Sequence, residues 1–180
     1  MRGYFGIGVE GASKAMNVGS VLRTAHAFGA SFVFTIAAVY KREDLERSDT
    51  AASEGAVPFY EFAGVSDLEL PAGCELVGIE LLDEAVDLPS FRHPPRCAYV
   101  LGPERGSLSP ALLSRCRYTV KIPTRFCINL GLAAAIVLYD RQLQLGRFAP
   151  RPTRPGGPRE PLPAHRFGPP LLRGTRGGKP

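Results

Sequence analysis

The chain has 180 residues, of which 44% are hydrophobic and 22% are charged, and its formal net charge is +5. This length and composition are typical of a globular protein with one principal domain. No apolar run reaches the roughly 18 residues of a membrane span, and the first residues lack the apolar core and cleavage site of a signal peptide. We therefore expect a protein without a membrane segment.

The first two predicted elements are a strand and a helix. The apolar, β-rich run Tyr4–Val9 predicts the strand. Asn17 then stands directly before an apolar stripe and is the predicted N-cap, with Val18 as the first helical residue. The stripe has the spacing of one helix face and consists of Val18, Val21, Leu22, Ala25 and Phe28.

The chain continues with more apolar runs and two further helices. The runs predict strands at Phe32–Val39, Glu75–Leu82, Cys97–Leu101 and Tyr118–Ile122. Ser109 and Pro110 predict the N-cap and first residue of a short helix. Residues 131–145 predict a final helix that ends at Gly146. Uninterrupted apolar strands that alternate with helices predict an α/β fold, a mostly parallel sheet with helices on both faces.

The last 32 residues differ from the rest of the chain. They hold nine of the seventeen prolines, and their seven Lys or Arg residues against one Glu give a net charge of +6, whereas residues 1–148 have −1. We predict a folded domain at 1–148 and a disordered, basic tail at 149–180. Two roles for the tail stay open, an electrostatic tether to nucleic acid and a solubilising terminus.

Four cysteines and three histidines are scattered along the chain, and none of the cysteines forms a C-x-x-C pair. This spacing predicts no metal site. Unpaired cysteines are typical of reduced thiols in a cytoplasmic protein, which is the compartment we expect.

Three segments carry polar residues that the core does not require. In the first, residues 16–30, Arg23 lies outside the apolar stripe, and small neighbours at Gly19 and Ala27 leave room for a ligand. The alternative is a solvated arginine on an exposed face.

The second segment follows the predicted strand Cys97–Leu101, at the strand end where ligands bind in parallel sheets. Gly102 and Gly106 allow a ligand to approach the backbone. Glu104 would repel a phosphate, so it suits a ligand with a positive centre or hydroxyl donors. The alternative is a tight turn with a surface ion pair.

The third segment lies between Pro123 and the final helix. Its Cys127 and Asn129 stand between buried elements and must find hydrogen-bond partners. The alternative is that Asn129 is only an N-cap.

Taken in order, the three segments resemble the SpoU/TrmH RNA methyltransferases over residues 3–146. Asn17-x-Gly19 with Arg23 and Ala27-Phe28-Gly29 resembles motif 1 of that family. Gly102-x-Glu104-x-Gly106 resembles motif 2, and Ile122-Pro123 with Asn129 before an alanine-rich helix resembles motif 3.

The resemblance implies a fold with a deep C-terminal trefoil knot, a homodimer, S-adenosylmethionine as methyl donor, and 2′-O-methylation of a ribose in tRNA or rRNA. Asn17 and Arg23 would face the ribose, while Glu104 and Asn129 would organise the loops. The implied cofactor-binding residues are Ile79, Gly102, Gly106, Ile122, Cys127 and Ile128. Cys127 stands where the family usually has serine.

Two other functions remain open from the sequence. One is base methylation of tRNA by another knotted methyltransferase group, and the other is an RNA- or cofactor-binding protein without activity. The role of Arg23 also stays open between a general base and an electrostatic clamp on phosphate and alkoxide.

Overall fold

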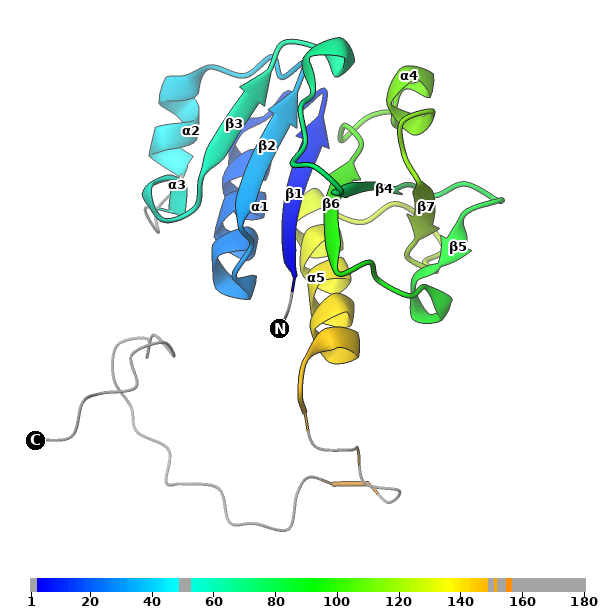
Figure 1. The fold of residues 1–180 in the computed structure, drawn as a ribbon. Helices are drawn as coiled ribbons and strands as arrows, with labels where there is room; N and C mark the ends of the chain where they lie inside the picture. Colours follow the sequence, from blue (N-terminus) through cyan, green and yellow to red (C-terminus); the bar gives the residue numbers. More distant parts are fainter. Residues whose placement is uncertain (1–2, 49–52, 149–150, 152–154, 157–180) are drawn as a thin grey trace, which may run out of the picture. The chain divides into compact units, whose positions relative to one another are not determined.

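The computed structural model describes residues 3–48, 53–148, 151 and 155–156 (Figure 1). The chain divides into two units, Met1–Phe148 and Ala149–Pro180. The predicted tail lies almost entirely outside the described residues, so the following description concerns the first unit.

Seven strands form one sheet, and every strand pairing among the described residues is parallel. The order across the sheet is β3-β2-β1-β6-β4-β7-β5. This confirms the predicted parallel α/β fold. The strands are β1 (Tyr4–Glu10), β2 (Phe32–Ile36), β3 (Phe59–Phe62), β4 (Glu75–Ile79), β5 (Val86–Asp87), β6 (Arg96–Leu101) and β7 (Tyr118–Lys121).

Three predicted strands end earlier in the structure than in the sequence analysis, β7 by only one residue, at Lys121. β2 ends at Ile36 because Ala37 adopts a left-handed backbone with φ of 49°, which is uncommon for a residue other than glycine. β4 ends at Ile79; the amide of Glu80 still donates to the carbonyl of Val120, and its carboxylate accepts hydrogen bonds from the amides of Leu81 and Leu108.

The described residues also form five helices and two short 3₁₀ turns, which connect the strands except for α5, which follows the last strand. They are α1 (Ala15–Phe28), α2 (Arg42–Ser48), α3 (Ser53–Ala56), η1 (Val65–Asp67), η2 (Leu88–Ser90), α4 (Pro110–Leu113) and α5 (Leu130–Leu145).

The helix starts test the predicted caps. Ser109 caps α4 by accepting a hydrogen bond from the amide of Leu112, so this predicted cap is confirmed. Asn129 caps α5 by accepting one from the amide of Gly131, as the alternative interpretation of Asn129 expected. The predicted cap at Asn17 is wrong, because α1 begins at Ala15 with Lys14 as its N-cap. Asn17 lies inside the first turn, and its side chain is hydrogen-bonded to Glu104 instead.

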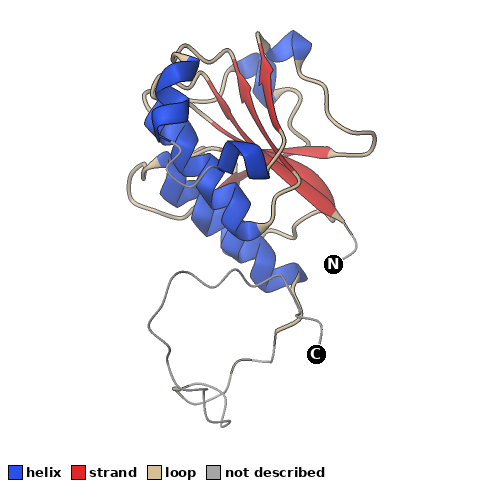
Figure 2. Cartoon of the chain, turned by 90° about the vertical axis from the view of Figure 1, so that its left-hand side faces the viewer, coloured by secondary structure: helices blue, strands red, loops and turns tan. Residues whose placement is uncertain are grey.

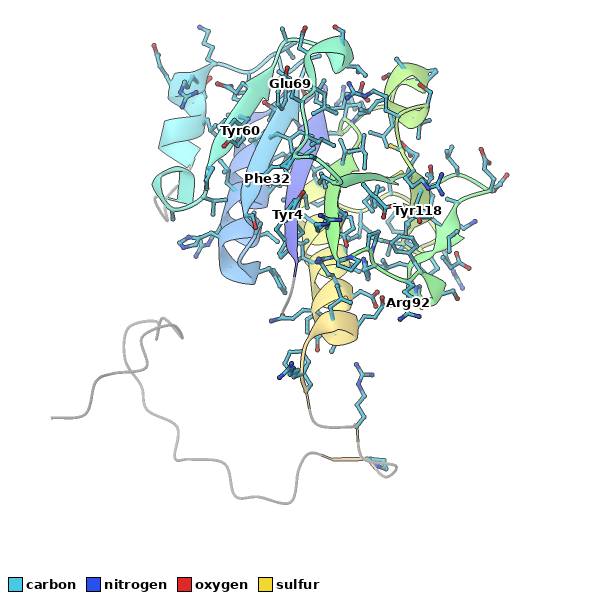
Figure 3. The ribbon with its side chains drawn as sticks, in the orientation of Figure 1. Tyr4, Phe32, Tyr60, Glu69, Arg92 and Tyr118 are labelled. Carbon is cyan, nitrogen blue, oxygen red and sulfur yellow. The ribbon has the colours of Figure 1, made fainter. Side chains whose placement is uncertain are left out.

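The two faces of the sheet carry separate apolar cores. The larger core joins the sheet to α1, α2 and α5, and Figure 2 shows the long helices gathered on that side. The smaller core includes Phe32 and Phe34 and is covered by Leu68, Leu108 and Leu112, the last from α4 (Figure 3 labels Phe32 and the neighbouring Tyr60). Helices therefore cover both faces, as predicted. Three helices, α1, α2 and α5, pack on the larger core, whereas the smaller core has the four-residue α4.

The carboxyl-terminal half of the chain is interleaved with earlier strands. After β4 the chain runs to β5 at the sheet edge, returns as β6 between β1 and β4, and then forms β7 between β4 and β5. α5 finally packs beside α1, so closely that a Cβ on Gly131 would lie 2.9 Å from the Cβ of Ser20. This order supports the trefoil knot, which itself stays a prediction.

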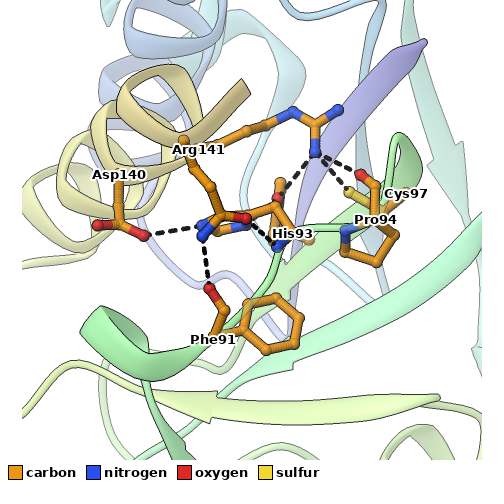
Figure 4. Close-up of polar contacts among 8 residues, drawn as sticks. Phe91, His93, Pro94, Cys97, Asp140 and Arg141 are labelled. Carbon is orange, nitrogen blue, oxygen red and sulfur yellow. Dashed lines mark hydrogen bonds and ion pairs between the residues drawn. The ribbon is translucent and has the colours of Figure 1, made fainter. Parts of the chain in front are cut away.

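A buried polar cluster fixes the distal half of α5 (Figure 4). The guanidinium of Arg141, 1% exposed, donates hydrogen bonds to the carbonyls of Pro94 (2.6 Å) and Pro95 (2.9 Å). His93 joins the phenol of Tyr99 (2.6 Å) to the carboxylate of Asp140 (2.9 Å). These contacts attach α5 to the segment that leads into β6.

We expect this cluster to make stability depend on pH. Burial lowers the pKa of His93, and Arg141 lowers it further, against an opposing hydrogen bond to Asp140. The folded protein therefore keeps His93 neutral below the usual histidine pKa of about 6.5, where the unfolded chain binds the proton. The stabilisation that neutral His93 contributes to the free energy of unfolding is complete above that pH. It is lost as pH falls, by at most about 1.4 kcal/mol per pH unit.

Urea unfolding at a series of pH values between neutral and mildly acidic would measure this loss. His93→Gln should unfold with a shallower pH dependence than the natural chain. His26→Gln, at an exposed position on α1, is the matched control and should change nothing. Equal slopes for the natural chain and His93→Gln would contradict the assignment.

Candidate active site

One pocket opens at the edge of the sheet where the parallel strands end. Its volume is about 580 Å³, part of it open to solvent, and its walls come from the ends of β4, β6 and β7 and the start of α5. All six cofactor-binding residues proposed from the sequence line it, namely Ile79, Gly102, Gly106, Ile122, Cys127 and Ile128. The fold thus brings together three segments that are far apart in the sequence.

The pocket also contains residues that sequence reasoning missed, namely Glu80, Leu81, Leu101, Pro103, Thr124, Leu130 and Ala133. Glu80 is the most informative of them, because it supplies the carboxylate of the pocket. Its Oε1 accepts from the amide of Leu81 at 3.0 Å, and its Oε2 accepts from the amide of Leu108 at 2.7 Å. The available signal was a carboxylate that interrupts the predicted apolar strand Glu75–Leu82.

Gly102 is required by a close approach within the protein itself. A Cβ at this position would lie 3.1 Å from the amide nitrogen of Leu108 and 3.3 Å from Oε2 of Glu80. The sequence analysis attributed the glycine to an approaching ligand, whereas the nearest neighbours are the partners of the Glu80–Leu108 hydrogen bond. Gly106, with φ of 134°, is the glycine of this loop that needs an unusual backbone.

Glu104 joins the same loop to the start of α1. Its carboxylate accepts hydrogen bonds from Nδ2 of Asn17 at 2.6 Å and from the hydroxyl of Ser13 at 3.0 Å. Partial burial raises the pKa of Glu104, but the hydrogen bonds from Asn17 and Ser13 outweigh burial and leave the pKa below its usual value. The carboxylate is therefore ionised at neutral pH and holds the Asn17 amide in one orientation.

This geometry corrects one expectation about the loops. Glu104 organises motif 2 against motif 1, while Asn129 organises motif 3 by capping α5. The far end of the motif 2 loop is fixed by Glu10, whose buried carboxylate accepts from the amide (2.7 Å) and the hydroxyl (2.5 Å) of Ser109. The carboxylate that lines the pocket is that of Glu80, whereas Glu104 is not among the described lining residues.

Arg23 lies on an exposed face of α1, six residues beyond Asn17. Within the described part of the chain, the residues that line the pocket do not include it. The structure thus brings Asn17 and Glu104 together and places Asn129 between two residues that line the pocket, Ile128 and Leu130. None of the four predicted catalytic residues, Asn17, Arg23, Glu104 and Asn129, is itself among the described lining residues.

The described residues contain no group of three His, Cys, Asp or Glu side chains that could hold a metal ion. They also contain no helix that is long and apolar enough to cross a membrane.

Several solved structures share this fold. The AdoMet-bound rRNA methyltransferase from Sinorhizobium meliloti aligns with a TM-score of 0.71 at 21% identity, over 81% of this chain and 58% of that chain. The SpoU methyltransferase AviRb from Streptomyces viridochromogenes, in complex with AdoMet, aligns with a TM-score of 0.68 at 25% identity, over 79% of this chain and 62% of that chain. The present chain therefore spans little more than half of either protein.

A third structure, concerned with the 2-OH methylation of C/U34 on tRNA, aligns with a TM-score of 0.66 at 22% identity, over 79% of this chain and 91% of that chain. The sequence matches no curated protein. The model of the SpoU rRNA Methylase family matches residues 5–139, which include all three motif segments. This match confirms the resemblance seen in the sequence, and the chain belongs to the SpoU rRNA Methylase family.

Proposed function

We propose that this protein is an S-adenosylmethionine-dependent RNA methyltransferase that transfers a methyl group to a ribose 2′-OH of tRNA or rRNA. The observation that carries the proposal is the pocket at the ends of β4, β6 and β7, which collects residues of motifs 2 and 3 in a member of the SpoU family.

The residues of the pocket fit the proposed methyl donor. Ile79, Ile122 and Ile128 provide apolar walls for a flat ring. The Glu80 carboxylate has lone pairs beyond the two used by backbone amides and can accept from ribose hydroxyls. When bound, S-adenosylmethionine supplies an activated methyl group on a positively charged sulfur.

The protein's own residues have to align the reacting groups and manage charge. Alignment alone can contribute roughly 7–11 kcal/mol to a barrier. The Glu104–Asn17 and Glu104–Ser13 hydrogen bonds hold the start of α1 against the cofactor loop. Guanidinium groups stay protonated in proteins, so we assign Arg23 to clamping a phosphate and stabilising the developing alkoxide rather than to proton abstraction.

Mass spectrometry of nucleosides tests the proposal. Unmodified tRNA and rRNA would be incubated with the protein and isotope-labelled S-adenosylmethionine, then digested to nucleosides. We expect the label on a ribose. A label on a base would instead support the base-methylating alternative, and a bound cofactor without label transfer would support a non-catalytic binding protein.

We also propose a homodimer that is formed through α5. Apolar side chains are exposed on this helix with the spacing of one face, at Leu132, Ile136, Tyr139 and Leu143. An exposed apolar stripe of this kind is typical of an association surface. A dimer would also bring a second chain to the α1 and α5 side, where Arg23 is exposed.

Ile136→Asp should convert the dimer to a monomer, because a charge would be buried without a partner at the interface. Light scattering would measure the mass. The matched control is Val86→Asp, which changes an exposed valine on β5 and should leave the dimer intact. A monomeric natural chain, or a dimer that tolerates Ile136→Asp, would exclude this interface.

The four cysteines are free in the structure, which supports the proposed cytoplasmic location. For the basic residues 149–180 we propose a contribution to RNA affinity through phosphate neutralisation.

A further inference from the structure

A second depression opens at the carboxyl edge of the strands, with a volume of about 1120 Å³. One wall is formed by residues 13–16, which lead into α1. The other is formed by residues 39–41, 43 and 44, which lead into α2. We call this depression the lysine groove, because Lys14 lies on the first wall and Lys41 on the second.

The two walls are held in place by backbone hydrogen bonds. The amide of Val39 donates to the carbonyl of Ala12 at 2.9 Å, and the amide of Gly11 donates to Ile36 at 2.8 Å. The left-handed Ala37 turns the chain into the second wall, and its amide donates to Phe62 at 2.9 Å. Strained backbone of this kind is concentrated at ligand-binding segments, and here it gives the groove a preformed shape.

The chemistry of the walls matches the parts of one nucleotide. Lys14 and Lys41 offer positive charge for a phosphate. Met16 and Val39 are 66% and 76% exposed, and with the ring of Tyr40 they offer an apolar surface for a base. The carboxylates of the groove, Glu43 and Asp44, share the second wall with Lys41, so the four charged side chains leave the groove without net charge. The carboxylates can accept hydrogen bonds from the amino group of a base.

The groove adjoins the cofactor pocket through a shared loop. Ser13 lines the groove and donates its hydroxyl hydrogen bond to Glu104. Glu104 lies between Gly102 and Gly106, which line the cofactor pocket. A strand of RNA in the groove therefore lies one loop away from the methyl donor.

We propose that the lysine groove binds the nucleotide next to the one that is methylated, in a single-stranded stretch of the RNA. Its phosphate contacts Lys14 and Lys41, and its base lies on Met16, Val39 and Tyr40. This inference rests on the proposed methyltransferase function and adds a substrate subsite to it.

The salt dependence of RNA binding tests whether Lys14 and Lys41 contact phosphates of the RNA. A short single-stranded RNA of mixed sequence, labelled at one end, would be titrated at several salt concentrations with the full chain and with Lys14→Gln/Lys41→Gln. Two lost phosphate contacts should make the slope of log K against log salt shallower by about 1.4 for a single strand. Arg92→Gln/Arg117→Gln removes the same charge at the amino ends of β6 and β7 and should leave the slope unchanged (Figure 3 labels Arg92).

The outcomes separate this inference from the function on which it rests. Calorimetric titration of S-adenosylmethionine should give the same affinity for the natural chain and the lysine variant. Failure of the natural chain to bind the cofactor would overturn the proposed function. Equal salt slopes for the lysine variant and its arginine control would contradict RNA binding in the lysine groove but not the proposed methyltransferase function.

Substitutions of Tyr40 test whether a base lies on the apolar surface of the groove. Tyr40→Leu should weaken binding of the same RNA roughly tenfold, within the range measured for loss of one base–aromatic stack. Tyr40→Phe loses the same phenol contacts as Tyr40→Leu but keeps the ring, so it should bind like the natural chain. Equal affinities for the Leu and Phe variants would show that no base stacks on the Tyr40 ring.

Discussion

Gly102→Val should remove binding of S-adenosylmethionine while the protein stays folded. The valine Cβ would lie only 3.1 Å from the amide nitrogen of Leu108 and 3.3 Å from Oε2 of Glu80. It would therefore push apart a charge-assisted hydrogen bond of 2.7 Å, worth about 1.5–3 kcal/mol. Because 1.4 kcal/mol is about tenfold in affinity, we expect a loss of roughly tenfold to a hundredfold from this displacement alone.

Calorimetric titration of S-adenosylmethionine and of its demethylated product would measure the loss, with circular dichroism to confirm folding. Gly55→Ala is a suitable control, because a Cβ there meets no atom within 4 Å. Glu80→Gln keeps the shape of the loop and removes its charge, and it should weaken binding less than Gly102→Val. Natural affinity in Gly102→Val would mean that the loop is only a turn.

The parts of this fold that could be predicted from the sequence are those with local signals. The caps at Ser109 and Asn129 depend on an amide two or three residues away, and both are present. The buried strands are continuous apolar runs, and five of them were recognised. β3 was missed because its middle residues, Tyr60 and Glu61, are exposed and polar, and β5 because it has only two residues.

The missed parts of the site depend on contacts between distant segments. Asn17 looked like a helix cap, but its amide donates to Glu104, 87 residues away. Glu80 lay inside the predicted strand Glu75–Leu82, but its carboxylate accepts from the amide of Leu108, 28 residues away. Such pairs form only when β6 is placed between β1 and β4, and no local pattern encodes that order. The family motifs located the pocket because they mark the loops that meet there.

Arg23→Ala should abolish methyl transfer and leave the affinity for S-adenosylmethionine nearly intact. The guanidinium is exposed on α1 and does not line the described pocket, so its loss removes no contact to the donor. Loss of one group that stabilises a developing oxyanion typically lowers kcat by about a hundredfold to a thousandfold.

Single-turnover kinetics at saturating RNA would measure the rate, and calorimetry would measure cofactor affinity. Arg92→Ala removes an exposed arginine near the amino end of β6 and is the matched control, which should keep the natural rate. Arg23→Lys keeps a positive charge but not the planar fork that binds phosphate through two bonds, so it should recover only part of the rate. If Arg23→Ala kept half of the natural rate, the residue would be a solvated arginine and motif 1 would act through Asn17 alone.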